Sequence, residues 1–61
     1  MIFAAFGIET DSSGEENIVF GPYWVTAKDQ QNAITKATLA NADTLKGVNL
    51  SKTKILAHAF T

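Results

Sequence analysis

The segment Met1-Ile2-Phe3-Ala4-Ala5-Phe6-Gly7-Ile8 carries the strongest structural signal of the chain, because it predicts a β-strand that has no polar side. Side chains alternate along an extended backbone, so residues 2, 4, 6 and 8 share one face and residues 3, 5 and 7 share the other. Both sets are apolar. A strand of a one-sided sheet would alternate apolar and polar residues. This strand is therefore expected in the middle of a sheet, with both of its faces covered.

The length of 61 residues predicts one small domain, residues 1–61, with a single core. A domain of this size buries only about 60% of the surface that its unfolded chain exposes, so its stability is marginal. Chains this short usually gain stability from disulfides, a metal or oligomerisation. The sequence has no cysteine and only one histidine, His58, too few ligands for a typical structural metal site. We therefore expect oligomerisation, and no metal or cofactor.

The charge pattern disfavours nucleic acid as a partner. The chain carries five lysines, no arginine and six acidic residues, with a net charge of −1. Nucleic-acid-binding proteins usually present a basic patch, and bidentate phosphate and base contacts are made chiefly by arginine. The lysines are scattered; Lys52 and Lys54 are the closest pair and are interpreted as a solvated entry to a strand.

The start of the sequence bears on the cellular location that we expect for the protein. The opening apolar run lacks a basic segment before it and a small-residue cleavage site after it, so no signal peptide is expected. It is also much shorter than the roughly 20 residues that cross a bilayer. We expect a protein of the cytoplasm or of a virion, without a membrane partner.

Residues 9–17 are polar and rich in turn-forming residues, which predicts the loop of a β-hairpin. Oxygen atoms of Asp11, Ser13, Glu15 and Glu16 cluster in this segment. Their spacing does not match the calcium-binding loop of an EF-hand, so a solvated loop is favoured and cation binding stays an open alternative.

Residues 18–26 predict a second strand that is interrupted by Gly21-Pro22. Proline has no amide proton for a sheet ladder, so this segment is expected at an edge or to contain a bulge. Its aromatic residues Phe20, Tyr23 and Trp24 could stack on bases or sugars. No basic groove accompanies them, so a core or protein-interface role is favoured.

A helix is predicted to begin at Thr26 as N-cap, with Asp29 three residues later, and to continue through Asn41. Its apolar stripe consists of Ala33, Ile34, Ala37 and Ala40. Leu39 lies opposite this stripe and is either an ordinary exposed leucine or an anchor for a neighbouring molecule. A short extra turn is expected near residues 43–46, and Gly47 is expected to close it in the left-handed conformation.

Residues 53–60 predict a third strand, again apolar on both faces apart from His58. A catalytic histidine needs a nucleophile and an orienting carboxylate within reach. The serines and aspartates of this chain form no recognisable catalytic motif around it. His58 is therefore interpreted as a packed or interface residue, no catalytic residue is assigned, and the chain is not expected to be an enzyme.

Together these segments predict an α+β fold, a single ββαβ domain with a three-stranded antiparallel sheet of order 2-1-3 and one helix packed on one face. The residues expected to face the helix are Ile2, Ala4, Phe6 and Ile8. The residues expected on the far side are Phe3, Ala5, Leu56 and Phe60, together with either Tyr23 or Trp24, a choice that the bulge at Pro22 leaves open. The predicted protein interface comprises Phe3, Ala5, Tyr23, Trp24, Leu39, Leu56, His58 and Phe60.

One short helix can cover only one face of such a sheet, and the remaining apolar face would mark a protein interface. We therefore expect a small structural or assembly protein that binds copies of itself or a larger lattice, such as a capsid decoration, cement or tail protein of a bacteriophage-type virion. The alternative is a small antitoxin-like regulator or inhibitor that adds to another protein through a sheet edge. Binding of single-stranded nucleic acid is the least favoured of the three.

Overall fold

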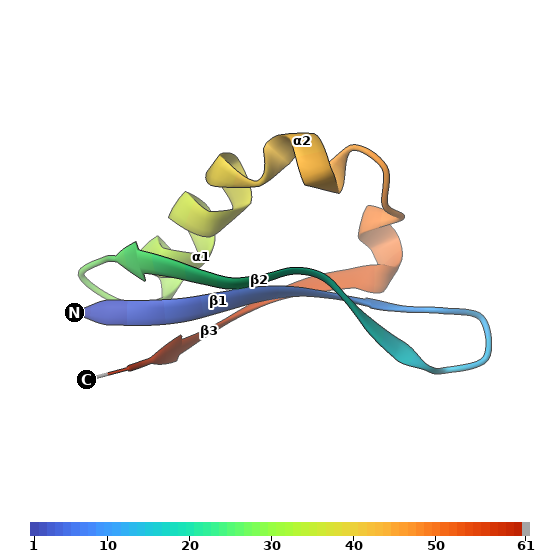
Figure 1. Ribbon diagram of the computed structural model, residues 1–61, viewed down its shortest axis with the longest axis horizontal. Helices are drawn as coiled ribbons and strands as arrows, with labels where there is room; N and C mark the ends of the chain where they lie inside the picture. Colours follow the sequence, from blue (N-terminus) through green and yellow to red (C-terminus); the bar gives the residue numbers. More distant parts are fainter. Residues whose placement is uncertain (61) are drawn as a thin grey trace.

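The structure is a computed structural model and describes residues 1–60 (Figure 1). Its strands and helices follow in this order: β1 (Ile2–Thr10), β2 (Glu16–Thr26), α1 (Gln30–Ala40), α2 (Ala42–Leu45), η1 (Leu50–Lys52) and β3 (Thr53–Ala59). The three strands form one sheet of order β2-β1-β3. Both neighbours of β1 run antiparallel to it. The predicted α+β fold, with its strand order and central first strand, is confirmed.

The helices lie on one side of the sheet only, and the opposite side has no layer on it (Figure 1). The described chain therefore covers one of the two apolar faces of β1. The beginning of β1 and the end of β3 lie side by side at one end of the sheet, where Phe60 N donates to Ile2 O (2.8 Å) (Figure 1).

The face of β1 that meets the helices is the one formed by Phe3, Ala5 and Gly7. Phe3 is only 3% exposed and Ala5 is completely buried. The prediction that Phe3 and Ala5 lie on the far side is wrong. The residues predicted to face the helix, which are Ile2, Ala4, Phe6 and Ile8, lie on the uncovered side instead.

The reason is the size of the residues at the contact between helix and sheet. Helix α1 packs through Ala33 and Ala37, which are both completely buried. Alanine side chains let the helix lie close to the sheet, and small residues on the strand beneath leave room for the rest of the core. Ala5 leaves room for the helix and Gly7 leaves room for the ring of Phe20, whereas Phe6 and Ile8 would fill this space.

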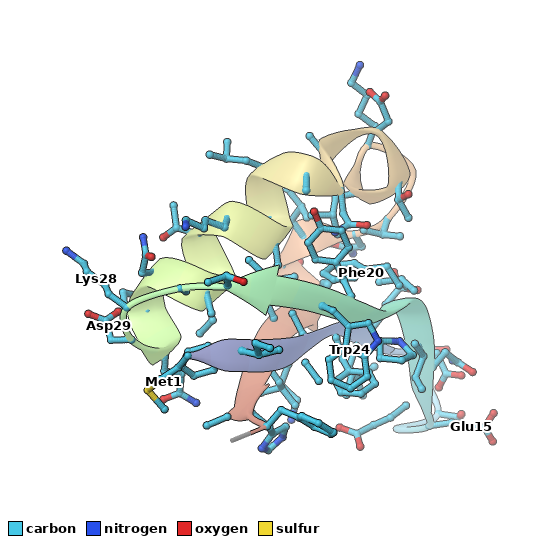
Figure 2. All side chains as sticks on the ribbon, turned by 60° about the vertical axis from the view of Figure 1, so that its left-hand side comes forward. Met1, Glu15, Phe20, Trp24, Lys28 and Asp29 are labelled. Carbon is cyan, nitrogen blue, oxygen red and sulfur yellow. The ribbon has the colours of Figure 1, made fainter. Side chains whose placement is uncertain are left out.

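Strand β2 contains the predicted irregularity, at the edge of the sheet. Gly21 has φ +121°, and the Gly21–Pro22 peptide bond is cis. The pairing with β1 shifts between Ala5 and Gly7 and again between Gly7 and Ile8. As a result Phe20, opposite Gly7, lies on the helix side, and Trp24 lies on the other side (Figure 2).

The hairpin that joins β1 to β2 is tighter than predicted. The strands extend to Thr10 and from Glu16, which leaves only residues 11–15 as the turn. Backbone hydrogen bonds close this turn, from Asp11 N to Glu15 O (2.9 Å) and from Gly14 N to Asp11 O (3.0 Å). Glycine is suited to its position because Gly14 has φ +88°.

Helix α1 begins later than predicted, because its N-cap is Asp29 rather than Thr26. The Asp29 carboxylate accepts a hydrogen bond from Asn32 N (2.7 Å). Thr26 still pairs with Ile2 in the sheet, so the chain must leave the sheet before it can coil. The extra turn is confirmed as α2.

The expected left-handed closure at Gly47 is wrong, since the glycines with positive φ in residues 1–60 are Gly14 and Gly21. Lys46, which caps α2, is itself in the right-handed helical region, and Gly47 N donates to Thr44 O (3.4 Å). The chain therefore continues from α2 in a right-handed turn.

Candidate functional site

The candidate site is the side of the sheet that no helix covers. The register places the same-face side chains of the three strands in neighbouring columns, because residues opposite each other in a sheet point to the same side. We call this surface the open face. It comprises Ile2, Ala4, Phe6 and Ile8 from β1, Ile18 and Trp24 from β2, and Leu56, His58 and Phe60 from β3 and the residue after it.

The open face is apolar and strongly exposed. Trp24 is 53% exposed, Ile18 64% and Phe60 67%. The side chains between them that are half-buried are Ala4, Phe6, Ile8 and Leu56. Isolated exposed apolar residues are ordinary, but a contiguous patch on a soluble monomer rarely exceeds a few hundred Å². This surface therefore has the character of an interface.

An aromatic pair stands at one end of the open face. The rings of Trp24 and Phe60 have centroids 4.9 Å apart and planes at 82°, an edge-to-face arrangement. The two residues come from opposite edges of the sheet, so their rings meet above β1. Ala4 lies beside Trp24 in the register and contributes only a methyl group, which leaves room for the contact.

A pair of oppositely charged side chains stands at the other end of the open face. Lys54 Nζ lies 3.4 Å from Glu16 Oε2, and both side chains remain more than half exposed. Lys54 is opposite Ile8, and Glu16 is opposite Thr10. The pair is balanced in charge and contributes little to stability because solvent screens it.

The structure brings together four of the eight predicted interface residues, namely Trp24, Leu56, His58 and Phe60. Phe3 and Ala5 lie beneath the helix. Tyr23 pairs with Ala5 and so lies on the helix side, where it is 37% exposed at the edge.

Leu39 lies on α1 and is 73% exposed, so it belongs to a different surface from the open face. The open-face residues that sequence reasoning missed are Ile2, Ala4, Phe6, Ile8 and Ile18. The small residues Ala5 and Gly7 were the signal that could have identified the covered face, because they leave room for the helix and for the ring of Phe20.

Leu39 borders a shallow apolar hollow of about 260 Å³ between α1, α2 and η1. Leu50 stands on the same rim and is 63% exposed. The hollow is small beside the open face and lies on the opposite side of the sheet, so we regard the open face as the principal site.

A second hollow, of about 410 Å³ and open to solvent, lies where the hairpin meets η1 and β3. Its lining residues are Thr10, Asp11, Ser51, Lys52, Thr53 and Lys54. The two lysines do come together here, but Lys54 pairs with Glu16 and the carboxylate of Asp11 is part of the same wall. This balance of charge gives a phosphate group little attraction.

The oxygens of the polar loop are used within the loop. One Asp11 carboxylate oxygen accepts hydrogen bonds from Ser13 Oγ (2.6 Å), Ser13 N (2.9 Å) and Glu15 N (3.0 Å). The bond from the Ser13 hydroxyl, followed by the bond from the Glu15 backbone, lowers the pKa of Asp11. Across residues 1–60, no group of three histidine or acidic side chains is placed to hold a metal ion.

His58 is exposed on the open face, opposite Ala4. Two of the aspartates lie elsewhere in the fold, Asp11 in the hairpin turn and Asp43 in α2 on the helix side of the sheet. Neither is therefore placed to orient the imidazole of His58, as a general base would require.

Side chains of α1 occupy one position on each edge of the sheet. Lys36 Nζ donates to Thr26 O (2.9 Å), and Gln30 Nε2 donates to Ala57 O (2.8 Å). Backbone groups alternate in direction along a strand. Because Ala27 N bonds to Met1 O and Phe60 N bonds to Ile2 O, the carbonyls of Thr26 and Ala57 point outward from the sheet. An added strand would have to displace these contacts.

Among residues 1–60, no helix combines the length and apolar character that crossing a membrane requires. Comparison with protein-family models, with curated proteins and with solved structures finds no match to this chain.

Proposed function

We propose that this chain is a non-enzymatic structural protein that works by assembly, adding to copies of itself or to a larger protein lattice through its open face. The observation that carries this proposal is the uncovered apolar face of the sheet, with Trp24, Ile18 and Phe60 each more than half exposed. A capsid decoration, cement or tail protein of a bacteriophage-type particle is the form of assembly that we expect for a chain so small, without cysteine and close to neutral in charge.

Burial of this face would matter for so small a domain. Apolar surface contributes about 25 cal/mol per Å² when it leaves water, so 400 Å² would contribute on the order of 10 kcal/mol before the costs of association. Folded domains are typically stable by about 5–15 kcal/mol. Association would therefore add an amount comparable with the stability of the fold itself.

The alternative of a regulator that binds by strand addition receives less support. Lys36 and Gln30 occupy outward-pointing carbonyls at the two edges, and Pro22 lacks an amide proton on edge strand β2. Binding of nucleic acid is also less supported, because the lysine that borders the open face, Lys54, is paired with Glu16.

The experiment that tests the proposal uses Trp24, the single tryptophan of the chain, as a reporter of the open face. We expect its emission to shift to the blue and its quenching by acrylamide to fall as the purified chain is concentrated, or when it is bound in its native particle. The substitution Ile18→Lys should prevent the change, and Leu39→Lys, on the other side of the molecule, should not. A folded monomer whose Trp24 stays quenchable at high micromolar concentration and in cell extract would contradict the proposal.

A further inference from the structure

The charges of the open face permit one copy to pack on another. Its border carries one acidic and one basic residue, Glu16 and Lys54, which already pair at 3.4 Å. Two such faces brought together would meet without like-charge repulsion, since neither has an excess of one sign. A partner with a strongly charged surface would gain nothing from this face.

The area of the open face matches what a small stable dimer needs. With about 150–250 Å² for a fully exposed aromatic side chain and somewhat less for an aliphatic one, the exposed fractions correspond to roughly 600 Å² of apolar surface per copy. Two copies would bury roughly 1,200 Å², which is at the lower end of the range for specific interfaces. The open face alone is large enough for this and needs no other surface.

The shape of the sheet determines how two copies would meet. Sheets that pack face to face keep their strands within about 30° of each other and lie about 10 Å apart. Phe6 and Leu56 are opposite each other in the middle of the open face. A two-fold axis that runs along the line from Phe6 to Leu56, across the strands, would place β2 of one copy over β2 of the other and the Trp24–Phe60 end of one copy over the Ile8–Ile18 end of the other.

We propose that the open face is covered by a second copy of this chain, in a two-fold, face-to-face sandwich of two three-stranded sheets with Phe6 and Leu56 near the axis. This inference rests on the proposed function, because it names the partner of that same face. The contacts of Lys36 and Gln30 at the sheet edges favour stacking of faces over extension of the sheet through its edges.

The test is charge complementation at exposed positions that the two-fold arrangement brings together. Ile18→Lys and Trp24→Glu alter side chains at the two ends of β2 that are each more than half exposed, so each variant should keep the fold, as circular dichroism would verify. By sedimentation, the wild-type chain should have twice the mass of the 6.6 kDa monomer, and each variant alone should be monomeric. An equimolar mixture of the two should recover the dimer.

A second pair of variants tests the axis. Leu56→Lys and Leu56→Glu should each be monomeric and should form a dimer when mixed, because a residue near a two-fold axis faces its own copy. The matched control is Leu39→Lys mixed with Leu39→Glu, which alters an exposed leucine on α1. Each of these variants alone, and their mixture, should be dimeric like the wild-type chain.

Four outcomes would overturn the inference, and two of them leave the proposed function standing. These two are a dimer that neither variant pair restores, and a monomer whose Trp24 is shielded only by a different protein of a native particle. The other two would contradict both proposals: a dimer that survives the open-face substitutions but dissociates with Leu39→Lys, and a monomer whose Trp24 is shielded by phosphatidylcholine vesicles.

Discussion

The ring of Phe20, on β2, occupies the space that a side chain at Gly7, on β1, would fill. A Cβ atom at Gly7 would lie 2.5 Å from Cε2 and 2.6 Å from Cδ2 of that ring. Phe20 is only 8% exposed and belongs to the core. The absence of a side chain at Gly7 thus lets the ring of Phe20, from an irregular edge strand, pack directly against the central strand in the core.

We therefore expect Gly7→Ala to destabilise the fold by about 1–3 kcal/mol, the usual cost of overpacking a core. The extra methyl group would force the Phe20 ring out of its place. Urea unfolding followed by circular dichroism measures the change. Gly47→Ala is the control, since nothing lies within 4 Å of a Cβ there, and it should change stability by less than about 0.5 kcal/mol. Equal stability of the two variants would show that Phe20 does not rest on Gly7.

Gly21 is required for a different reason. Its φ of +121° is one that other residues rarely adopt, and a Cβ there would lie 2.7 Å from the backbone oxygen of Ala5. A backbone atom cannot swing aside, so Gly21→Ala should cost about 2–3 kcal/mol. Gly14→Ala, with φ +88° and open space around its Cβ, should cost only about 1–2 kcal/mol. Thermal unfolding of the two variants separates the effect of the contact with Ala5 from the effect of conformational strain. A larger loss of stability in Gly14→Ala than in Gly21→Ala would show that the contact with Ala5 adds no cost.

Asp29 caps the N-terminus of α1, so Asp29→Ala should destabilise the fold by about 1 kcal/mol. Asp29→Ser retains an oxygen that can accept from Asn32 N and should restore most of that loss. The control is Asp43→Ala, whose side chain is 99% exposed and paired only with exposed Lys46, and which should have almost no effect. Chemical denaturation measures all three. A loss of about 1 kcal/mol in Thr26→Ala, together with no loss in Asp29→Ala, would instead show that Thr26 is the N-cap, as the sequence pattern predicts.

The hairpin turn should weaken in acid. Hydrogen bonds from Ser13 and Glu15 hold the pKa of Asp11 below its usual value, so folding favours the ionised carboxylate. Its contribution to stability is therefore complete above about pH 4 and is lost as the pH falls through the lowered pKa of the folded state. Asp11→Ala should lower the melting temperature at neutral pH and flatten its fall in acid. An Asp11→Ala variant with the same acid profile as the wild type would contradict this role.

The element order and sheet topology could be predicted because they depend on local patterns. The apolar run at residues 1–8, Gly21-Pro22 and the alanine stripe of the helix each predict an element or an edge by themselves, and a two-sided apolar strand belongs in the middle of the sheet. The start of the helix could not be located in this way. Thr26 and Asp29 are both good N-caps, and the pairing of Thr26 with Ile2, a contact between distant segments, decides between them.

The sequence predicts that an apolar face of the sheet stays uncovered, but not which residues form that face. Its pattern is enough to show that β1 has two apolar sides and that one short helix cannot cover both. Strand alternation has a period of two, so it treats the two sides as equals and does not identify the covered one. The covered side is set by contacts between distant segments, because Ala5 leaves room for the buried Ala33 and Ala37 of the helix and Gly7 leaves room for the ring of Phe20. The bulge at Gly21 turns Phe20 to that side and leaves Trp24 on the other.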